Sequence, residues 1–206
     1  MSAVPPLREE LAKIRSSAQT PRLMLHCCCA PCASYVLEYL SPYFKITALY
    51  YNPNITPVEE YVKRAAEFQK LPLTDGYPNH IDFVLCGYDA AGYDSVASPF
   101  FDEPEGGLRC RECFKLRLEE TARRASEGGY DYFTTTLSVS PHKDAGTLNE
   151  IGGALAAKYG VGYLYSDFKK AEGFKRSIEL SGQYGLYRQV YCGCRPLTGY
   201  KNDKIR

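Results

Sequence analysis

Eight of the nine cysteines in this 206-residue chain fall into three short clusters, which are the first place to look for chemistry. The clusters read HCCCAPC, RCREC and YCGC, and they contain Cys27, Cys28, Cys29, Cys32, Cys110, Cys113, Cys192 and Cys194. Grouped thiols outside a secreted disulfide framework indicate metal binding or redox catalysis. The ninth cysteine, Cys86, stands alone at the end of an apolar stretch, and we expect it to be a buried structural residue.

The first two clusters have the composition of a four-thiolate metal site. The Cys110-x-x-Cys113 pair, combined with a second group of thiols, can hold either a tetrahedral zinc ion or a 4Fe–4S cluster. Spacing alone leaves both metals open. Two features favour iron and sulfur: adjacent Cys28 and Cys29 are unusual for a zinc knuckle, and the first cluster contains more thiols than one closed zinc site needs.

The third cluster has a different spacing. Cys192 and Cys194 are separated by a single glycine, which makes them a poor chelating pair but allows a very small and strained disulfide ring. Strained disulfides are easily reduced and are often catalytic, so the pair is predicted to be redox-active. The alternative is two unpaired thiols on a C-terminal loop.

Strands and helices are predicted to alternate along the chain and to position these thiols. The expected strands are 22–26, 44–51, 81–86, 132–137 and 161–165, and the expected helices are 31–40, 57–71, 110–126 and 143–159, the second of them opened by a capping box at Thr56. This order predicts an α/β fold with a mostly parallel sheet and helices on both faces. The first cluster then follows the first strand, at the sheet edge where such folds bind ligands. Residues 88–109 are expected to form a long irregular insertion of the kind that is usually functional.

The N-terminal sequence bears on the compartment. It lacks the basic start and apolar stretch of a signal peptide, and no apolar run approaches the ~18 residues of a membrane span. We therefore expect a cytoplasmic protein with reduced thiols and no membrane partner.

The net charge of +1 conceals an uneven distribution. Residues 165–206 contain nine basic and four acidic residues, a net +5, which leaves −4 on the rest of the chain. We expect an α/β core over 1–165 and a basic C-terminal lobe over 166–206, packed on the same domain. Basic groups and tyrosines suit RNA phosphates and unpaired bases, although a solvated surface over a tyrosine-rich core would give the same composition. The candidate RNA-binding residues are Lys169, Lys170, Lys175, Arg176, Arg188 and Tyr191.

Taken together, six sequence blocks resemble the QueH-type epoxyqueuosine reductases over nearly the whole chain. The blocks are LMLHCCCAPC, YNPNITPVEEY, FDEPEGGLRCRECFKLRL, TTTLSVSPHKD, SDFKKAEGFKRSIELS and LYRQVYCGC. The resemblance implies a cytoplasmic oxidoreductase that reduces the epoxide of epoxyqueuosine, at the wobble position of tRNA anticodons, to give queuosine. It also implies a 4Fe–4S cluster without cobalamin, and a fold like that of the nucleotide α-hydrolase (HUP-type) enzymes.

The resemblance also implies roles for individual cysteines. The cluster ligands fall on Cys28, Cys29, Cys110 and Cys113, and the redox-active pair falls on Cys192 and Cys194. Because Cys27 precedes the first two ligands, the ligand register is uncertain by one residue. Cys32 is left over, either as a ligand of a second, mononuclear iron or as a thiol at the start of a helix.

Removal of the epoxide oxygen takes two electrons and two protons and releases water. The chain contains neither a G-x-G-x-x-G motif nor a P-loop, so we expect the electrons to pass through metal and sulfur, with an external electron donor. Candidate acids are Asp102, Asp144, Asp167 and His142, each of which could instead be a cap or a loop hydrogen-bonder.

Two further classes of protein stay open. One is a non-catalytic RNA-binding module stabilised by zinc. The other is an ATP-dependent tRNA-thiolation enzyme, which should carry an SGGxDS-like loop where this chain has CCCAPC.

Overall fold

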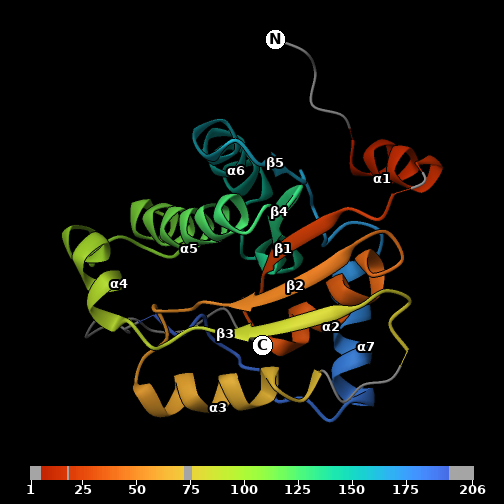
Figure 1. The fold of residues 1–206 in the computed structure, drawn as a ribbon. Coiled ribbons are helices and arrows are strands. Elements are labelled where there is room, and N and C mark those ends of the chain that lie inside the picture. Colours follow the sequence, from red (N-terminus) through yellow and green to blue (C-terminus); the bar gives the residue numbers. More distant parts are fainter. Residues whose placement is uncertain (1–5, 18, 72–75, 195–206) are drawn as a thin grey trace.

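A five-stranded parallel sheet forms the centre of the computed structural model, which describes residues 6–17, 19–71 and 76–194 (Figure 1). The strand order is β3-β2-β1-β4-β5, and every neighbouring pair is parallel. The strands are β1 (Arg22–His26), β2 (Lys45–Tyr50), β3 (Ile81–Leu85), β4 (Tyr132–Thr135) and β5 (Gly162–Tyr163). The prediction of a parallel α/β fold is confirmed, and all five expected strands are present, although β5 is shorter than expected.

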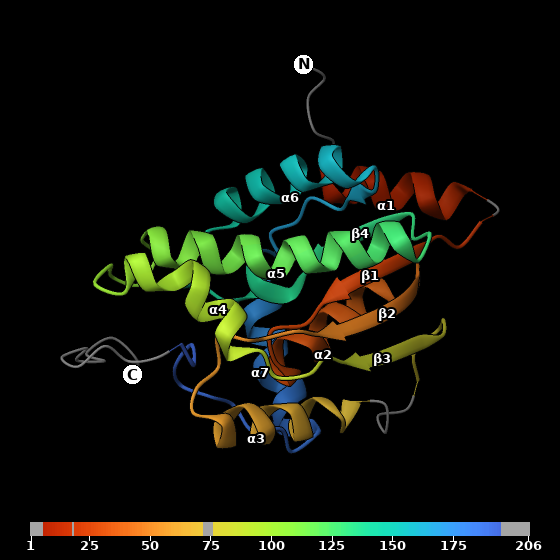
Figure 2. The same cartoon turned by 60° about the vertical axis from the view of Figure 1, so that its left-hand side comes forward.

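Helices cover both faces of this sheet (Figures 1 and 2). The α-helices are α1 (Leu7–Ser16), α2 (Ala30–Leu40), α3 (Val58–Phe68), α4 (Ala90–Ala97), α5 (Leu108–Glu127), α6 (Ala145–Tyr159) and α7 (Gly173–Gln183). Helices α2, α3 and α7 pack on one face, while α5 and α6 pack on the other. Two short 3₁₀ helices, η2 (Ser98–Phe100) and η3 (Thr136–Val139), follow α4 and β4.

The central strand β1 shows why both faces must be covered. Leu23 and Leu25 point into the core formed with α2 and α3, whereas Met24 points into the core formed with α5 and α6. Successive side chains of a strand face opposite sides, so a strand that is apolar throughout needs a helix layer on each side. All three side chains are at most 5% exposed.

Two local expectations from the sequence are wrong. Residues 88–109 are not irregular, because α4 and η2 occupy their middle: Asp89 caps α4 by accepting a hydrogen bond from the Gly92 amide (2.9 Å), and Tyr93 and Ala97 are buried one turn apart. Thr56 does not form a capping box. The residue before α3 is Pro57, in an extended conformation, and no side chain caps that helix.

The C-terminal segment packs against the same body as far as the structure describes it. Helix α7 lies on α2, and Phe168, Leu180 and Leu186 join the core that α2 and α3 share. The boundary at 165 therefore stays a prediction, and residues 195–206, including Arg195, lie outside the described residues. Within the described ranges, no helix is both long and apolar enough to cross a membrane.

Candidate thiol centre

The carboxyl ends of β1 and β4 meet where the strand order changes direction, and the first cysteine cluster begins there. His26 and Thr135 are paired at the last positions of these two strands. The chain passes from β1 to β2, which lies on one side of β1 in the sheet, and β4 lies on the other side of β1. Such a switch point is where open α/β sheets bind ligands.

His26 ties the three central strand ends together. Its Nε2 lies 3.1 Å from the carbonyl oxygen of Tyr51, and its Nδ1 lies 2.8 Å from Oγ1 of Thr135. Because a carbonyl only accepts, Nε2 carries the hydrogen and Nδ1 accepts from the Thr135 hydroxyl. Burial and the charge of Arg117 lower the pKa of His26 to about 3, so the ring is neutral and has the structural role that its strand position indicates.

Three thiols converge at the start of α2. The Sγ atoms of Cys28, Cys29 and Cys32 all lie within 4.8 Å of one another, and those of Cys28 and Cys29 are 3.8 Å apart. Two thiolates that share one tetrahedral ion through bonds of about 2.3 Å lie about 3.8 Å apart, so this donor set fits a thiophilic metal ion. The structure thus brings Cys32 together with two of the expected cluster ligands.

Hydrogen bonds orient these thiols and distribute their charge. The Thr136 hydroxyl accepts from the Cys28 amide (3.0 Å) and donates to Cys28 Sγ (3.3 Å). Hydrogen bonds from Cys28 and Cys32 hold the pKa of Cys29 well below its ordinary value, while the interaction with Cys29 raises the pKa of Cys28 to about 12. Of these three thiols, Cys29 is therefore the one whose thiolate the surrounding hydrogen bonds favour.

Cys27 faces a different environment from its neighbours. It is fully buried in the core on the α2 side, its thiol lies 3.5 Å from the Leu25 carbonyl oxygen, and it stands outside the group of three converging sulfurs. Burial raises its pKa well above the ordinary value. This placement supports a ligand register that begins at Cys28.

The other two cysteine clusters share one small pocket. Cys110 and Cys113, in the first two turns of α5, line it together with Cys192 and Cys194 of the C-terminal segment. Cys194 packs against the small cluster formed by Tyr93, Ala97 and Cys113, and Cys28 packs against the apolar core that contains Cys110. Residues from all three clusters are thus gathered at the same edge of the sheet.

Cys192 is the more acidic thiol of its pair. A hydrogen bond from Cys194 lowers the pKa of Cys192 well below its ordinary value, and the positive charges of Lys143 and Arg117 act in the same direction. The same hydrogen bond raises the pKa of Cys194. All four thiols of the pocket are free in the structure.

Three buried cations also line the pocket: Arg109, Arg117 and Lys143, none more than 7% exposed. Lys143 forms an ion pair with Glu105, at 2.7 Å between Nζ and Oε1. Within the described ranges, neither arginine is in ion-pair contact with a carboxylate, and Nε of Arg109 and Nη2 of Arg117 have no hydrogen-bond partner. Buried charges of this kind need compensation, which sulfur anions can supply.

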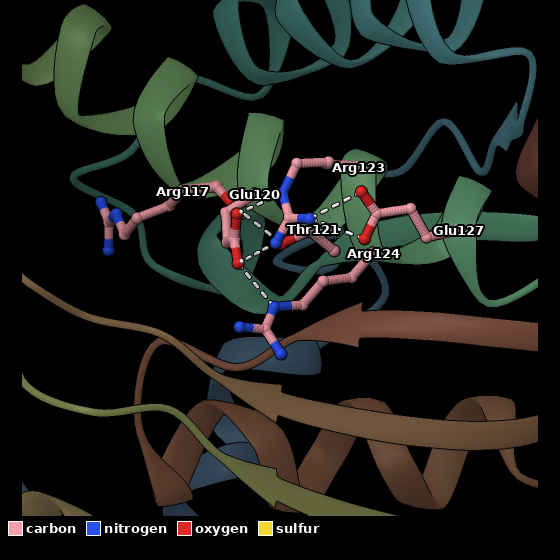
Figure 3. A network of polar contacts seen from close by, with 6 residues as sticks. All are labelled: Arg117, Glu120, Thr121, Arg123, Arg124 and Glu127. Carbon is pink, nitrogen blue, oxygen red and sulfur yellow. Dashed lines mark hydrogen bonds and ion pairs between the residues drawn. The ribbon is translucent and has the colours of Figure 1, made fainter.

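Arg117 joins the first two cysteine clusters. Its Nε donates to the Cys113 carbonyl oxygen (3.1 Å) and its Nη1 to Oδ1 of Asn52 (3.4 Å), and Asn52 in turn donates to the Cys27 carbonyl oxygen (2.9 Å). Figure 3 shows Arg117 pointing away from Glu120, whose carboxylate is occupied by Arg123 and Arg124. The guanidinium is therefore directed at the thiol centre rather than at the nearest acid of its own helix.

Sequence reasoning missed these cations and Tyr93, which also lines the pocket. A signal for Arg117 was present: it follows Cys113 by four residues and so lies on the same helix face as the thiols. Arg109, which precedes Cys113 by four residues in α5, carried the same signal, whereas Lys143 carries none because its burial depends on how the segment before α6 folds.

The candidate acids lie elsewhere. Asp144 caps α6 by accepting from the Thr147 amide (2.6 Å), and hydrogen bonds from the side chain and the amide of Thr147 lower its pKa. Asp167 pairs with Lys169 at 2.8 Å, and Asp102 and His142 are exposed. None of the four lines the cysteine pocket.

The candidate RNA-binding residues differ in how free they are. Lys170 and Lys175 are largely exposed, with side chains 80% and 69% accessible, and each approaches a single carboxylate, Asp167 at 3.8 Å and Glu172 at 3.4 Å. Arg176 is held by Glu38 (2.6 Å) and Glu179 (3.1 Å). The three that remain are engaged with the protein: Lys169 with Asp167, Arg188 with Ser177 and Ser181, and Tyr191 with Arg64.

Cys86 lies apart from the three clusters. It is half-buried against the core on the α5 side, where burial raises its pKa, so the expectation of a packing role is met only in part.

This fold and site define a cysteine-rich α/β protein with a candidate metal or redox centre at the carboxyl edge of its sheet. The family model described as epoxyqueuosine reductase QueH matches residues 23–196, and the chain belongs to this family. It is 41% identical over 189 residues to epoxyqueuosine reductase QueH of Streptococcus pyogenes serotype M1, covering 90% of this chain and 74% of that protein. It is 40% identical over 194 residues to the Staphylococcus epidermidis protein of the same name, covering 91% and 81%.

The chain is also similar to a solved structure, a predicted subunit of tRNA methyltransferase from Methanocaldococcus jannaschii. Its TM-score is 0.49 at 13% identity, covering 78% of this chain and 76% of that one.

Proposed function

We propose that the chain is an epoxyqueuosine reductase, an oxidoreductase of tRNA processing that removes the epoxide oxygen of epoxyqueuosine to give queuosine. The observation that carries this proposal is the gathering of three cysteine segments at one sheet edge, in a chain of the QueH family. The absence of a nucleotide-binding loop in CCCAPC argues against the ATP-dependent thiolation class.

The proposed cofactor is a 4Fe–4S cluster held by Cys28, Cys29, Cys110 and Cys113, without cobalamin. Cys28 and Cys29 lie just before α2, and Cys110 and Cys113 lie in the first two turns of α5, so all four are near helix N-termini, where helix dipoles favour thiolates, and the nearby Arg117 adds positive charge. Cys32, whose Sγ lies close to those of Cys28 and Cys29, is the proposed ligand of a second, mononuclear iron. When bound, the cluster would supply an electron-transfer route to the substrate.

The Cys192 and Cys194 thiols balance the reaction. Epoxide removal consumes two electrons and two protons and releases water. Oxidation of the Cys192 thiolate and the Cys194 thiol to a disulfide supplies two electrons and one proton, and the second proton comes from solvent. An external electron donor then reduces the Cys192–Cys194 disulfide for the next turnover. In this mechanism Lys143 and Arg117 stabilise the thiolate form of Cys192, from which the disulfide forms.

The proposed substrate is a cytoplasmic tRNA that carries epoxyqueuosine. Exposed Lys170 and Lys175 are suited to phosphates, and the proposal extends to Lys169, Arg176, Arg188 and Tyr191 as further contacts. Because Arg176 is occupied by two carboxylates, its contribution is expected to be the smallest.

The experiment is anaerobic purification followed by metal and sulfide analysis and by an assay on epoxyqueuosine-containing tRNA with a chemical reductant. We expect iron and sulfide in the protein and formation of queuosine. Cys194→Ser should lose multiple turnover, because no disulfide can form, and Cys86→Ser should keep it. A protein that contains only zinc and binds RNA without converting it would instead establish the RNA-binding module.

A further inference from the structure

The segment that carries Cys192 and Cys194 is held along helix α3 (Figure 2). Glu60, Arg64 and Glu67 are spaced four and three residues apart, so they share one face of that helix. Each of them contacts the chain between residues 187 and 192. The core-facing side of α3 is apolar and carries Tyr61, Ala65 and Phe68, whereas this neighbouring polar face binds the C-terminal segment.

Arg64 makes the central contacts. Its Nη1 donates to the Cys192 carbonyl oxygen (3.0 Å) and its Nη2 to the Tyr191 carbonyl oxygen (3.3 Å). Its Nε donates to Oε1 of Glu60 (2.7 Å), and the Tyr191 ring lies 4.9 Å from the guanidinium. The side chain is only 3% exposed, so these hydrogen bonds are shielded from water and fix both the arginine and the backbone that it binds.

Three further contacts hold the segment on either side of Arg64. The Thr56 amide donates to the Gly193 carbonyl oxygen (2.8 Å). The carbonyl oxygens of Tyr191, Cys192 and Gly193 therefore all accept hydrogen bonds. At the other end, the Tyr187 amide donates to Oε2 of Glu67 (2.8 Å), and the Lys63 ammonium lies 3.5 Å from the centre of the Tyr187 ring.

Gly193 is required by this arrangement. Its φ is +98°, and a Cβ added there would lie 2.9 Å from Nη1 of Arg64. The glycine between the two cysteines therefore gives more than a close approach of the sulfurs. It also lets the backbone lie directly on the guanidinium.

We propose that Arg64, braced by Glu60, is a positioning residue that fixes the CxC backbone so that its two thiols face the pocket of Cys110 and Cys113. This inference rests on the proposed redox role of the pair. Arg64 itself touches neither substrate nor thiol; it acts through the carbonyls of Tyr191 and Cys192.

The test compares Arg64→Gln, Arg64→Lys and Gly193→Ala with Arg123→Gln, a control that removes a half-exposed arginine of α5. Hydrogen exchange of residues 187–193 and alkylation rates of Cys192 and Cys194 are measured in the reduced protein, with Cys86 as internal reference. Arg64→Gln and Gly193→Ala should each accelerate exchange and alkylation by about tenfold or more, since hydrogen bonds to a charged donor are removed or misplaced. Arg64→Lys keeps the charge but only part of the bonding, and it should give an intermediate effect.

Turnover supplies the second measurement. Arg64→Gln should lower kcat by about tenfold or more, because misplaced thiols slow the reaction, while KM for tRNA should change by less, because only Arg188 and Tyr191 of the proposed tRNA contacts lie on the released segment. Unchanged exchange and alkylation in both Arg64→Gln and Gly193→Ala would overturn the inference, and so would faster exchange with unaltered kcat. If the wild-type protein shows no reductase activity, the proposed function fails, while the exchange data still decide whether Arg64 holds the segment.

Discussion

Arg117 brings a positive charge into a pocket lined by four cysteines and, among the described residues, by no carboxylate. Although burial disfavours its charged form, Cys113, Cys192 and Cys28 raise its pKa, and each of these belongs to a different cluster. One of its nitrogens has no hydrogen-bond partner among the described residues. A buried, uncompensated cation is costly, so the guanidinium is best explained as a counter-ion to thiolates or to a metal–thiolate centre.

Replacement of Arg117 therefore separates metal loading from folding. In Arg117→Met we expect the metal content per chain to fall several-fold, because the thiolates lose their counter-ion. The unfolding free energy of the metal-free protein should change by no more than about 1–2 kcal/mol, since the missing hydrogen bonds are offset by removal of a buried charge. Metal analysis and denaturant unfolding measure the two effects. Arg111→Met, which removes a half-exposed arginine paired with Glu150, is the control, and equal metal content in both variants would contradict the counter-ion role.

At the scale of the element, the start of the cysteine-bearing helix α2 could be predicted from local sequence signals, whereas helix α7, which packs on α2, could not. Cys29 directly precedes α2, and Pro31 lies in its first turn, as the sequence indicates. Helix α7 was not predicted, because its buried face includes Ser177 and Ser181 rather than a regular apolar stripe. A small polar residue can be buried when its hydroxyl donates to a backbone carbonyl of its own helix, and both serines do so.

Helix α6 offers a test of a candidate acid. Asp144 accepts a hydrogen bond from the Thr147 amide at the first turn, which is the geometry of an N-cap. Asp144→Ala should lower the unfolding free energy by about 1 kcal/mol, whereas Asp144→Asn should be nearly neutral because asparagine caps equally well. Both variants should retain reductase activity. Denaturant unfolding and turnover assays measure these outcomes, and an inactive but stable Asp144→Asn protein would establish Asp144 as the proton donor.

On the scale of the whole molecule, the sheet was predictable and the assembly of the site was not. Apolar strands separated by helical periods specify a parallel sheet and place Cys28 and Cys29 at its carboxyl edge. The approach of the C-terminal segment depends instead on Arg64, which binds carbonyls 127 and 128 residues away. Backbone carbonyls have no sequence signature, so interactions of this kind cannot be found from residue types and spacing.

The charge distribution of the whole molecule gives the last prediction. Residues 165–194 contain five basic and three acidic residues. Of the basic residues, only Lys170 and Lys175 project far into solvent. If tRNA phosphates bind this surface, the double variant Lys170→Glu/Lys175→Glu should weaken tRNA binding and reduce the slope of log Kd against log salt concentration by up to about 2, since each lysine neutralises one phosphate. The value of kcat at saturating tRNA should not change, because the thiol centre is intact. Arg176→Gln is the matched control, since Glu38 and Glu179 already neutralise that guanidinium. Binding measured over a salt series would show the same slope in the double variant and the wild type if the tRNA binds elsewhere.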